Sequence, residues 1–110
     1  MGYRSNLYAL VHGSDLIRFN ATIAEHELDE CFVEQGELDE LGYSRFTADG
    51  LKWYDDYKEV SAVNAIFKSS KHSAMLRVGE EGVNDEEIYS GMEDDPAQLF
   101  SISYSEHVDF

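Results

Sequence analysis

Residues 3–32, YRSNLYALVHGSDLIRFNATIAEHELDECF, contain the change of hydrophobic period on which the predicted fold depends. The first ten of these residues are rich in aromatic and aliphatic side chains, and Leu7, Ala9 and Val11 alternate with Tyr8 and Leu10. That pattern is typical of a largely buried strand. Beyond Gly13 the apolar residues recur at helical spacing, so the chain is predicted to open with a strand followed by a helix.

The predicted first helix can be capped by Ser14 or Asp15, and Gly36 would end it. Its apolar positions are Leu16, Ile17, Phe19, Ile23, Ala24, Leu28, Cys31 and Phe32. The pattern fits either one long helix or two shorter helices separated near residues 20–22, and it does not distinguish between them.

Two β-prone runs, residues 43–48 and 51–54, flank the dipeptide Asp49-Gly50. Asp-Gly is strongly favoured in the tight turns of β-hairpins, because such turns need positive φ angles. The sequence therefore predicts a hairpin centred on this dipeptide.

A second helix is predicted after the capping-box spacing of Asp56 and Glu59. Its apolar stripe consists of Val60, Val63, Ile66 and Phe67. Residues 74–78 and 99–104 then alternate as strands, and the acidic connection between them includes a predicted short strand around Ile88 and Tyr89.

This order of elements predicts an α+β fold, a two-layer sandwich with two helices on one face of a largely antiparallel sheet of four or more strands. A ferredoxin-like arrangement is the first choice within that class. The 110 residues contain no Pro/Gly/Ser-rich boundary, so residues 1–110 are expected to form a single acidic domain. An apolar content of 43% is sufficient for a modest core.

Three short blocks resemble a group of small, mostly uncharacterised phage and prophage proteins. They are MGYRS at residues 1–5, GLKWYDDY at residues 50–57 and RVGEE at residues 77–81. The resemblance implies a bacterial virus or mobile element as the setting, and a role inside the host cell. It implies no catalytic residues.

The acidic residues are clustered along the sequence, and this clustering is its strongest indication of function. The formal net charge is -15, and residues 25–40 and 80–95 each contain eight of the 23 carboxylates and no lysine or arginine. Such a field repels nucleic acid and anionic lipid, and it attracts basic protein surfaces or hard cations. We therefore expect no direct nucleic-acid binding and no membrane binding.

If residues 25–35 are helical, Glu27, Glu30 and Glu34 lie on one face, and Glu37 would extend the row. The remaining candidate partner-binding residues are Glu80, Glu81, Asp85, Glu86, Glu87, Glu93, Asp94 and Asp95. A row of carboxylates can imitate a phosphate backbone. The predicted function is inhibition of a basic host nucleic-acid-binding protein, such as a defence nuclease, by nucleic-acid mimicry.

Two other interpretations stay open. The acidic residues can be a solvated surface that serves solubility, or the chain can be a structural or homo-oligomeric phage accessory protein that associates through the region of Trp53. The sequence does not determine the oligomeric state.

Catalysis, a cofactor and a specific metal site are not expected. The four histidines are scattered, and the chain contains no serine nucleophile elbow, glycine-rich phosphate loop or EF-hand loop. The start of the sequence has no signal-peptide pattern, and no apolar run approaches the ~20 residues that span a bilayer. A cytoplasmic location in the host cell is therefore predicted.

Overall fold

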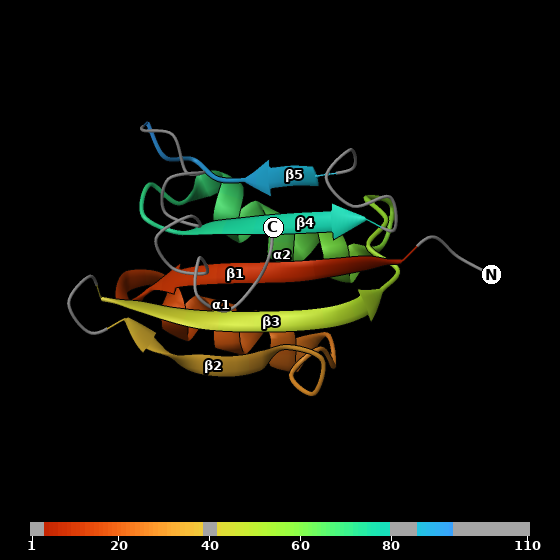
Figure 1. The fold of residues 1–110 in the computed structure, drawn as a ribbon, viewed down its shortest axis with the longest axis horizontal. Coiled ribbons are helices and arrows are strands. Elements are labelled where there is room, and N and C mark those ends of the chain that lie inside the picture. Colours follow the sequence, from red (N-terminus) through yellow and green to blue (C-terminus); the bar gives the residue numbers. More distant parts are fainter. Residues whose placement is uncertain (1–3, 39–41, 80–85, 94–110) are drawn as a thin grey trace.

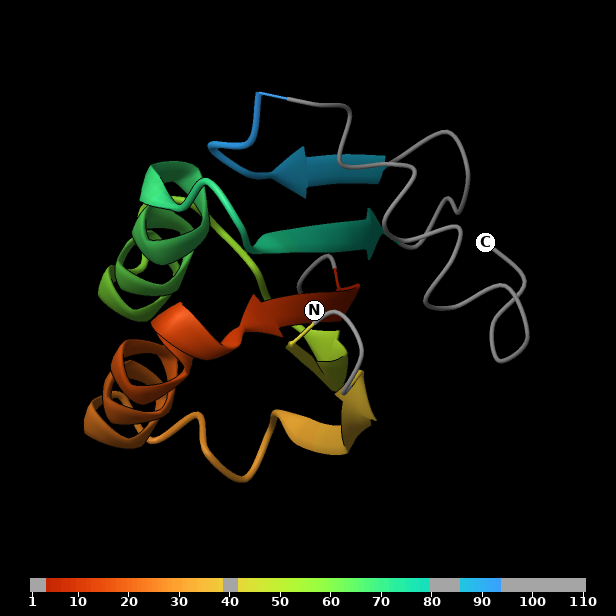
Figure 2. The same ribbon diagram turned by 90° about the vertical axis from the view of Figure 1, so that its left-hand side faces the viewer.

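The computed structural model describes residues 4–38, 42–79 and 86–93, which form a sheet covered on one face by two helices (Figures 1 and 2). The elements are strand β1 (Ser5–His12), helix α1 (Gly13–Glu25), strands β2 (Val33–Leu38) and β3 (Tyr43–Leu51), helix α2 (Lys58–Ser69), and strands β4 (Ala74–Gly79) and β5 (Glu86–Tyr89). Figure 2 shows both helices on the same side of the sheet. The predicted α+β two-layer sandwich is confirmed.

The sheet has the strand order β2-β3-β1-β4-β5, and every neighbouring pair is antiparallel. The first six elements follow the order βαββαβ, and their four strands lie in the order that defines a ferredoxin-like arrangement. Strand β5 extends this sheet beyond β4. Among the described strands, β2 and β5 are therefore the two edges (Figure 1).

Strand β1 lies in the middle of the sheet because both of its faces are apolar. Leu7, Ala9 and Val11 are fully buried in the core between sheet and helices. Leu10 is equally buried in a second apolar cluster, which includes Ala74 of β4. Since successive side chains of a strand point to opposite faces, this pattern requires apolar neighbours on both sides.

Helix α1 passes through residues 20–22 without a break. Its fully buried Phe19 lies at the centre of the aromatic core, with ring centroids 5.5 Å from Phe32, 4.9 Å from Phe46 and 5.7 Å from Phe67. The predicted cap by Ser14 or Asp15 is wrong. The N-cap residue is His12, whose Nδ1 accepts a hydrogen bond from the Ser14 backbone N–H at 3.2 Å.

Helix α2 confirms the predicted apolar stripe, since its four apolar positions are all buried against the sheet and α1. The predicted capping box is wrong. The N-cap is Tyr57, and no side chain makes a capping hydrogen bond there. Packing of the apolar stripe therefore stabilises this helix more than its cap does.

The predicted hairpin at Asp49-Gly50 is also wrong, because β3 continues through this dipeptide. The register with β1 shifts here, since Ser5 pairs with Leu51 whereas Leu7 pairs with Ala48. Gly50 has φ +66°, and its N–H donates to the Asn6 Oδ1 at 2.9 Å. The dipeptide thus supplies the positive φ of a β-bulge instead of a turn.

The two described strands after α2 agree with the strands predicted from the sequence. Strand β4 begins at the predicted residue, and β5 includes both Ile88 and Tyr89. The strand predicted at residues 99–104 lies outside the described residues. Within the described part of the chain, neither helix has the length and apolar character needed to cross a bilayer.

Candidate functional site

The first acidic run divides among the end of α1, the connection formed by residues 26–32, and strand β2. Helix α1 ends at Glu25, so the helix predicted through residue 35 is wrong. Glu27 lies in the connection with φ +60°, and Glu34 and Glu37 belong to β2. The predicted helical row of carboxylates therefore does not form from these residues.

Two physical causes end α1 where it does. Its last turn contains no basic residue, so the acidic residues beyond it would oppose the negative end of the helix dipole. A continued helix would also carry Phe32 roughly 10 Å further along the axis. Instead, the chain turns through the bonds Leu28 N–H to Ile23 O (2.6 Å) and Phe32 N–H to Leu28 O (3.1 Å). Phe32 is then 4% exposed and contacts the core.

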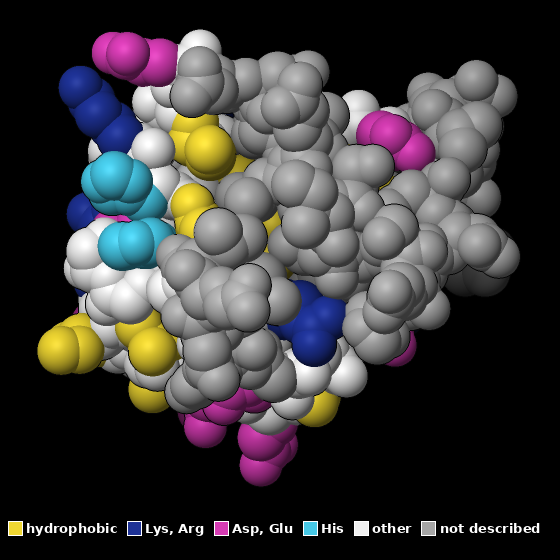
Figure 3. Space-filling view, turned by 60° about the vertical axis from the view of Figure 1, so that its left-hand side comes forward, with side chains coloured by type: hydrophobic (Ala, Val, Ile, Leu, Met, Phe, Trp, Pro, Cys, Tyr) yellow, Lys and Arg dark blue, Asp and Glu magenta, His cyan; other side chains and the backbone are white. Residues whose placement is uncertain are grey.

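The turn leaves a group of acidic side chains in solvent, here called the β2-side carboxylates. They are Glu25, Glu27, Asp29, Glu30 and Glu34, and all five are exposed. His26 Nε2 lies 3.6 Å from the Glu25 carboxylate, and this pair is ionic only when the imidazole is protonated. Figure 3 shows acidic side chains gathered at the bottom of the view, at the height at which β2 lies in Figure 1.

The second acidic run includes the other edge strand. Glu86 and Glu87 lie on β5, Glu93 follows it, and all three are exposed. Glu87 is partly neutralised, because its carboxylate lies 3.4 Å from Arg77 Nε and accepts a 3.0 Å hydrogen bond from the Tyr89 hydroxyl. Glu80, Glu81, Asp85, Asp94 and Asp95 lie outside the described residues.

Each acidic run therefore includes one edge strand of the described sheet, a relation that depends on the order of the strands. An edge strand has backbone N–H and C=O groups with no neighbour in the sheet. Charged side chains along such an edge hinder uncontrolled pairing with other chains, and they favour a partner of opposite charge.

The aromatic block near residue 53 is mainly structural. Trp53 is 6% exposed, and its Nε1 donates a buried 3.0 Å hydrogen bond to Asn64 Oδ1 of α2. The block therefore packs onto α2 through the buried Trp53 side chain. Tyr57, at 37% exposure, presents an aromatic ring to solvent nearby.

A polar cluster that the sequence did not predict joins the start of α1 to the connection before β4. The Asp15 carboxylate accepts hydrogen bonds from the hydroxyls of Ser70 at 2.5 Å and Ser73 at 2.6 Å. Ser73 is fully buried, and its hydroxyl also accepts the His12 backbone N–H at 2.8 Å. The rings of His12 and His72 lie 4.9 Å apart. No local signal could predict this cluster, because Asp15 is more than 50 residues away from the two serines along the chain.

The Asp15 carboxyl has a shifted pKa. Burial raises it, but the two hydroxyl donors and the Arg18 guanidinium lower it more, so the net pKa lies below the ordinary aspartate value. The anion is therefore the bonded form at neutral pH, and it links α1 to the α2–β4 connection. The described parts of the chain bring together no group of three or more His, Cys, Asp or Glu side chains suited to holding a metal ion.

Comparisons with protein-family models, with curated proteins and with solved structures give no match to this chain.

Proposed function

We propose that this protein is a small acidic binding module that occupies a basic surface of another protein and competes with nucleic acid for that surface. The observation that supports the proposal is that each acidic run includes one edge strand of the described sheet, β2 or β5, and exposes carboxylates on it or beside it. In the phage setting that the resemblance implies, the partner is a host nucleic-acid-binding protein, such as a defence nuclease, and binding inhibits it.

The β2-side carboxylates are the main contact surface in this proposal. All five are exposed and lie within the ten residues 25–34, which contain no lysine or arginine. Lysines and arginines that hold a phosphate backbone can pair with such carboxylates, and the opposite charges accelerate association at low ionic strength. Backbone groups along the outer edge of β2, which pairs with β3 alone among the described strands, can add hydrogen bonds to an extended partner segment.

The test uses two variants that each remove two formal negative charges. Glu30→Gln with Glu34→Gln changes the β2 side, whereas Asp49→Asn with Asp56→Asn removes exposed carboxylates outside both acidic runs. Partners are captured from a bacterial lysate on each protein and eluted with double-stranded DNA or RNA. We expect the native chain and the control variant to retain a basic protein that nucleic acid then elutes. The β2-side variant should not retain this protein.

The competing explanation is that the edge charges only keep the sheet edges apart and the protein soluble. Under that explanation both variants recover the same proteins, and nucleic acid elutes none selectively. Either result would refute the proposed inhibition by nucleic-acid mimicry.

A further inference from the structure

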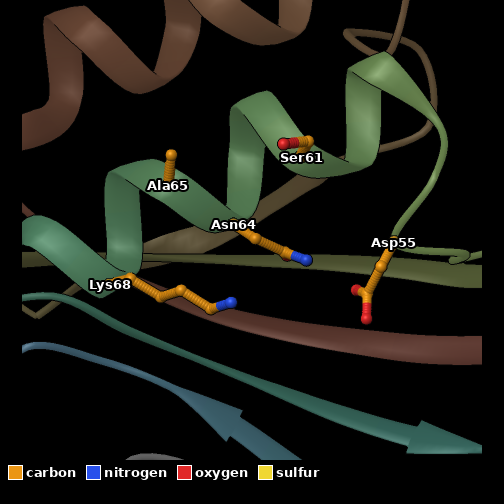
Figure 4. Close-up of a pocket in the computed structure, with 5 residues that line it drawn as sticks. All are labelled: Asp55, Ser61, Asn64, Ala65 and Lys68. Carbon is orange, nitrogen blue, oxygen red and sulfur yellow. The ribbon is translucent and has the colours of Figure 1, made fainter.

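A hollow of about 270 Å³ lies along one side of α2 (Figure 4). It is lined by Asp55, Ser61, Asn64, Ala65 and Lys68. Positions 61, 64 and 68 follow helical spacing, so one face of α2 supplies most of the lining. Asp55 comes from the connection before α2, and Figure 4 shows its carboxylate on the side of the helix to which Asn64 and Lys68 extend.

Asn64 gives this hollow a fixed hydrogen-bond donor. Its side-chain carbonyl accepts the Trp53 Nε1–H bond, so its amide NH₂ group points the other way, into the hollow (Figure 4). Asn64 is only 3% exposed, and no described residue accepts a hydrogen bond from this NH₂ group. The NH₂ nitrogen keeps contact with solvent at the hollow, so it can donate a hydrogen bond to water or to a bound ligand.

Two opposite charges lie at the hollow without neutralising each other. Lys68 Nζ lies 5.6 Å from the centre of the Tyr89 ring, and no carboxylate of the described residues lies within 4.0 Å of it. Asp55 likewise forms no ion pair within that part of the chain. The hollow thus offers a cation with an amide donor, and a separate carboxylate.

We propose that this hollow binds a small zwitterion of the amino-acid type. Its carboxylate accepts hydrogen bonds from the Asn64 amide and Lys68, and its ammonium group pairs with Asp55. The volume lies just below the ~300–1,000 Å³ typical of pockets for drug-sized ligands, which suits a smaller molecule.

Other ligand classes fit the lining less well. A phosphate or dicarboxylate would be repelled by Asp55, and a polyamine by Lys68. A metal ion would find one carboxylate and an Asn64 carbonyl already bonded to Trp53, far from the oxygen shell that Ca²⁺ or Mg²⁺ requires. A zwitterion matches both charges. This inference is independent of the proposed protein partner, because neither Asp55 nor Lys68 belongs to the acidic runs.

Trp53 provides a direct readout, since it is the only tryptophan and its indole is bonded to Asn64. Each standard L-amino acid is titrated into the full-length protein, with Trp53 fluorescence and the indole N–H resonance as signals. We expect at least one amino acid to give a saturable change in both signals. Its methyl ester, which lacks the carboxylate, and its N-acetyl derivative, which lacks the ammonium group, should not.

Matched variants test the assigned contacts. Lys68→Gln and Asp55→Asn should each weaken binding about tenfold, the loss expected for one charge-assisted hydrogen bond. Lys58→Gln, on the same helix, and Asp56→Asn, beside Asp55, remove the same charges outside the hollow and should leave affinity unchanged. The proposal is wrong if no amino acid changes the Trp53 signals, if the blocked derivatives bind equally well, or if both pairs of variants behave alike. None of these results would affect capture through the β2-side carboxylates.

Discussion

At the scale of single residues, Asp15 connects the start of α1 to the α2–β4 connection, which the local sequence does not predict. Its carboxylate accepts two short hydroxyl hydrogen bonds from the α2–β4 connection, and it lies 3.4 Å from Arg18 one turn along α1. Only 14% of the side chain is exposed, so solvent screens these interactions incompletely. Charge-assisted hydrogen bonds of this kind are the stronger ones in proteins.

Replacing Asp15 tests that role. Asp15→Asn should lower the free energy of unfolding at neutral pH by about 2 kcal/mol, since hydrogen bonds to a charged group are worth roughly 1.5–3 kcal/mol. Urea unfolding measures the change. The exposed control Asp49→Asn should stay within about 0.5 kcal/mol of the native chain.

The pH dependence of the same variant gives a second check. Because the folded-state pKa of Asp15 is lowered, its contribution is fully present above the ordinary aspartate pKa. It is lost as the pH falls through the lower folded-state pKa. The difference in free energy of unfolding between the native chain and Asp15→Asn should therefore shrink in acid. A difference as large at about pH 3 as at neutral pH would contradict this account.

At the scale of elements, the join between β5 and the end of α2 has no room for an added side chain. The Gly91 N–H donates to Ser70 O at 2.9 Å, and a Cβ at Gly91 would lie 2.6 Å from Lys68 O and 2.7 Å from Ser70 O. These are backbone atoms, so the chain itself must move to admit a methyl group.

We expect Gly91→Ala to destabilise the protein by about 2 kcal/mol, within the range for overpacking. It should also speed hydrogen exchange of the β5 amides. Gly13→Ala is the matched control, because a Cβ there meets its nearest atom, Gly42 O, at an ordinary 3.7 Å. If both variants unfold at the same urea concentration, close packing at Gly91 does not hold β5 in place.

At the scale of the whole molecule, self-repulsion among the acidic residues opposes folding. With a formal net charge of -15, the compact state holds like charges closer together than the unfolded chain does. Added salt shortens the range of this repulsion. Stability should therefore depend on ionic strength even without a partner.

We predict that the melting temperature rises from low to high sodium chloride, as measured by circular dichroism. Glu30→Gln with Glu34→Gln should raise the melting temperature at low salt and reduce its increase with salt. A melting temperature that is independent of salt in both proteins would show that the edge carboxylates are too far apart to repel one another appreciably.

Elements with a strong local pattern are predictable from the amino-acid sequence alone. The apolar run of β1 supplies apolar groups to both faces of a strand, and the stripe Val60, Val63, Ile66 and Phe67 supplies them to one side of a helix. Burial of these groups stabilises each element wherever it packs. The α+β class followed from the order of these elements. The concentration of acidic residues in two runs is also visible directly in the sequence.

The conformation of the ambiguous segments depends on contacts made in the assembled fold. Asp49-Gly50 suits a turn and a bulge equally, and pairing of β3 with β1 selects the bulge. Helix α1 ends where it does because Phe32 must reach the core and pack against Phe19 and Trp53. The edge positions of the acidic runs, the Asp15 cluster and the hollow at Asn64 all require contacts between residues distant in the chain. Such contacts form only when the whole sheet is assembled, so local propensity cannot specify them.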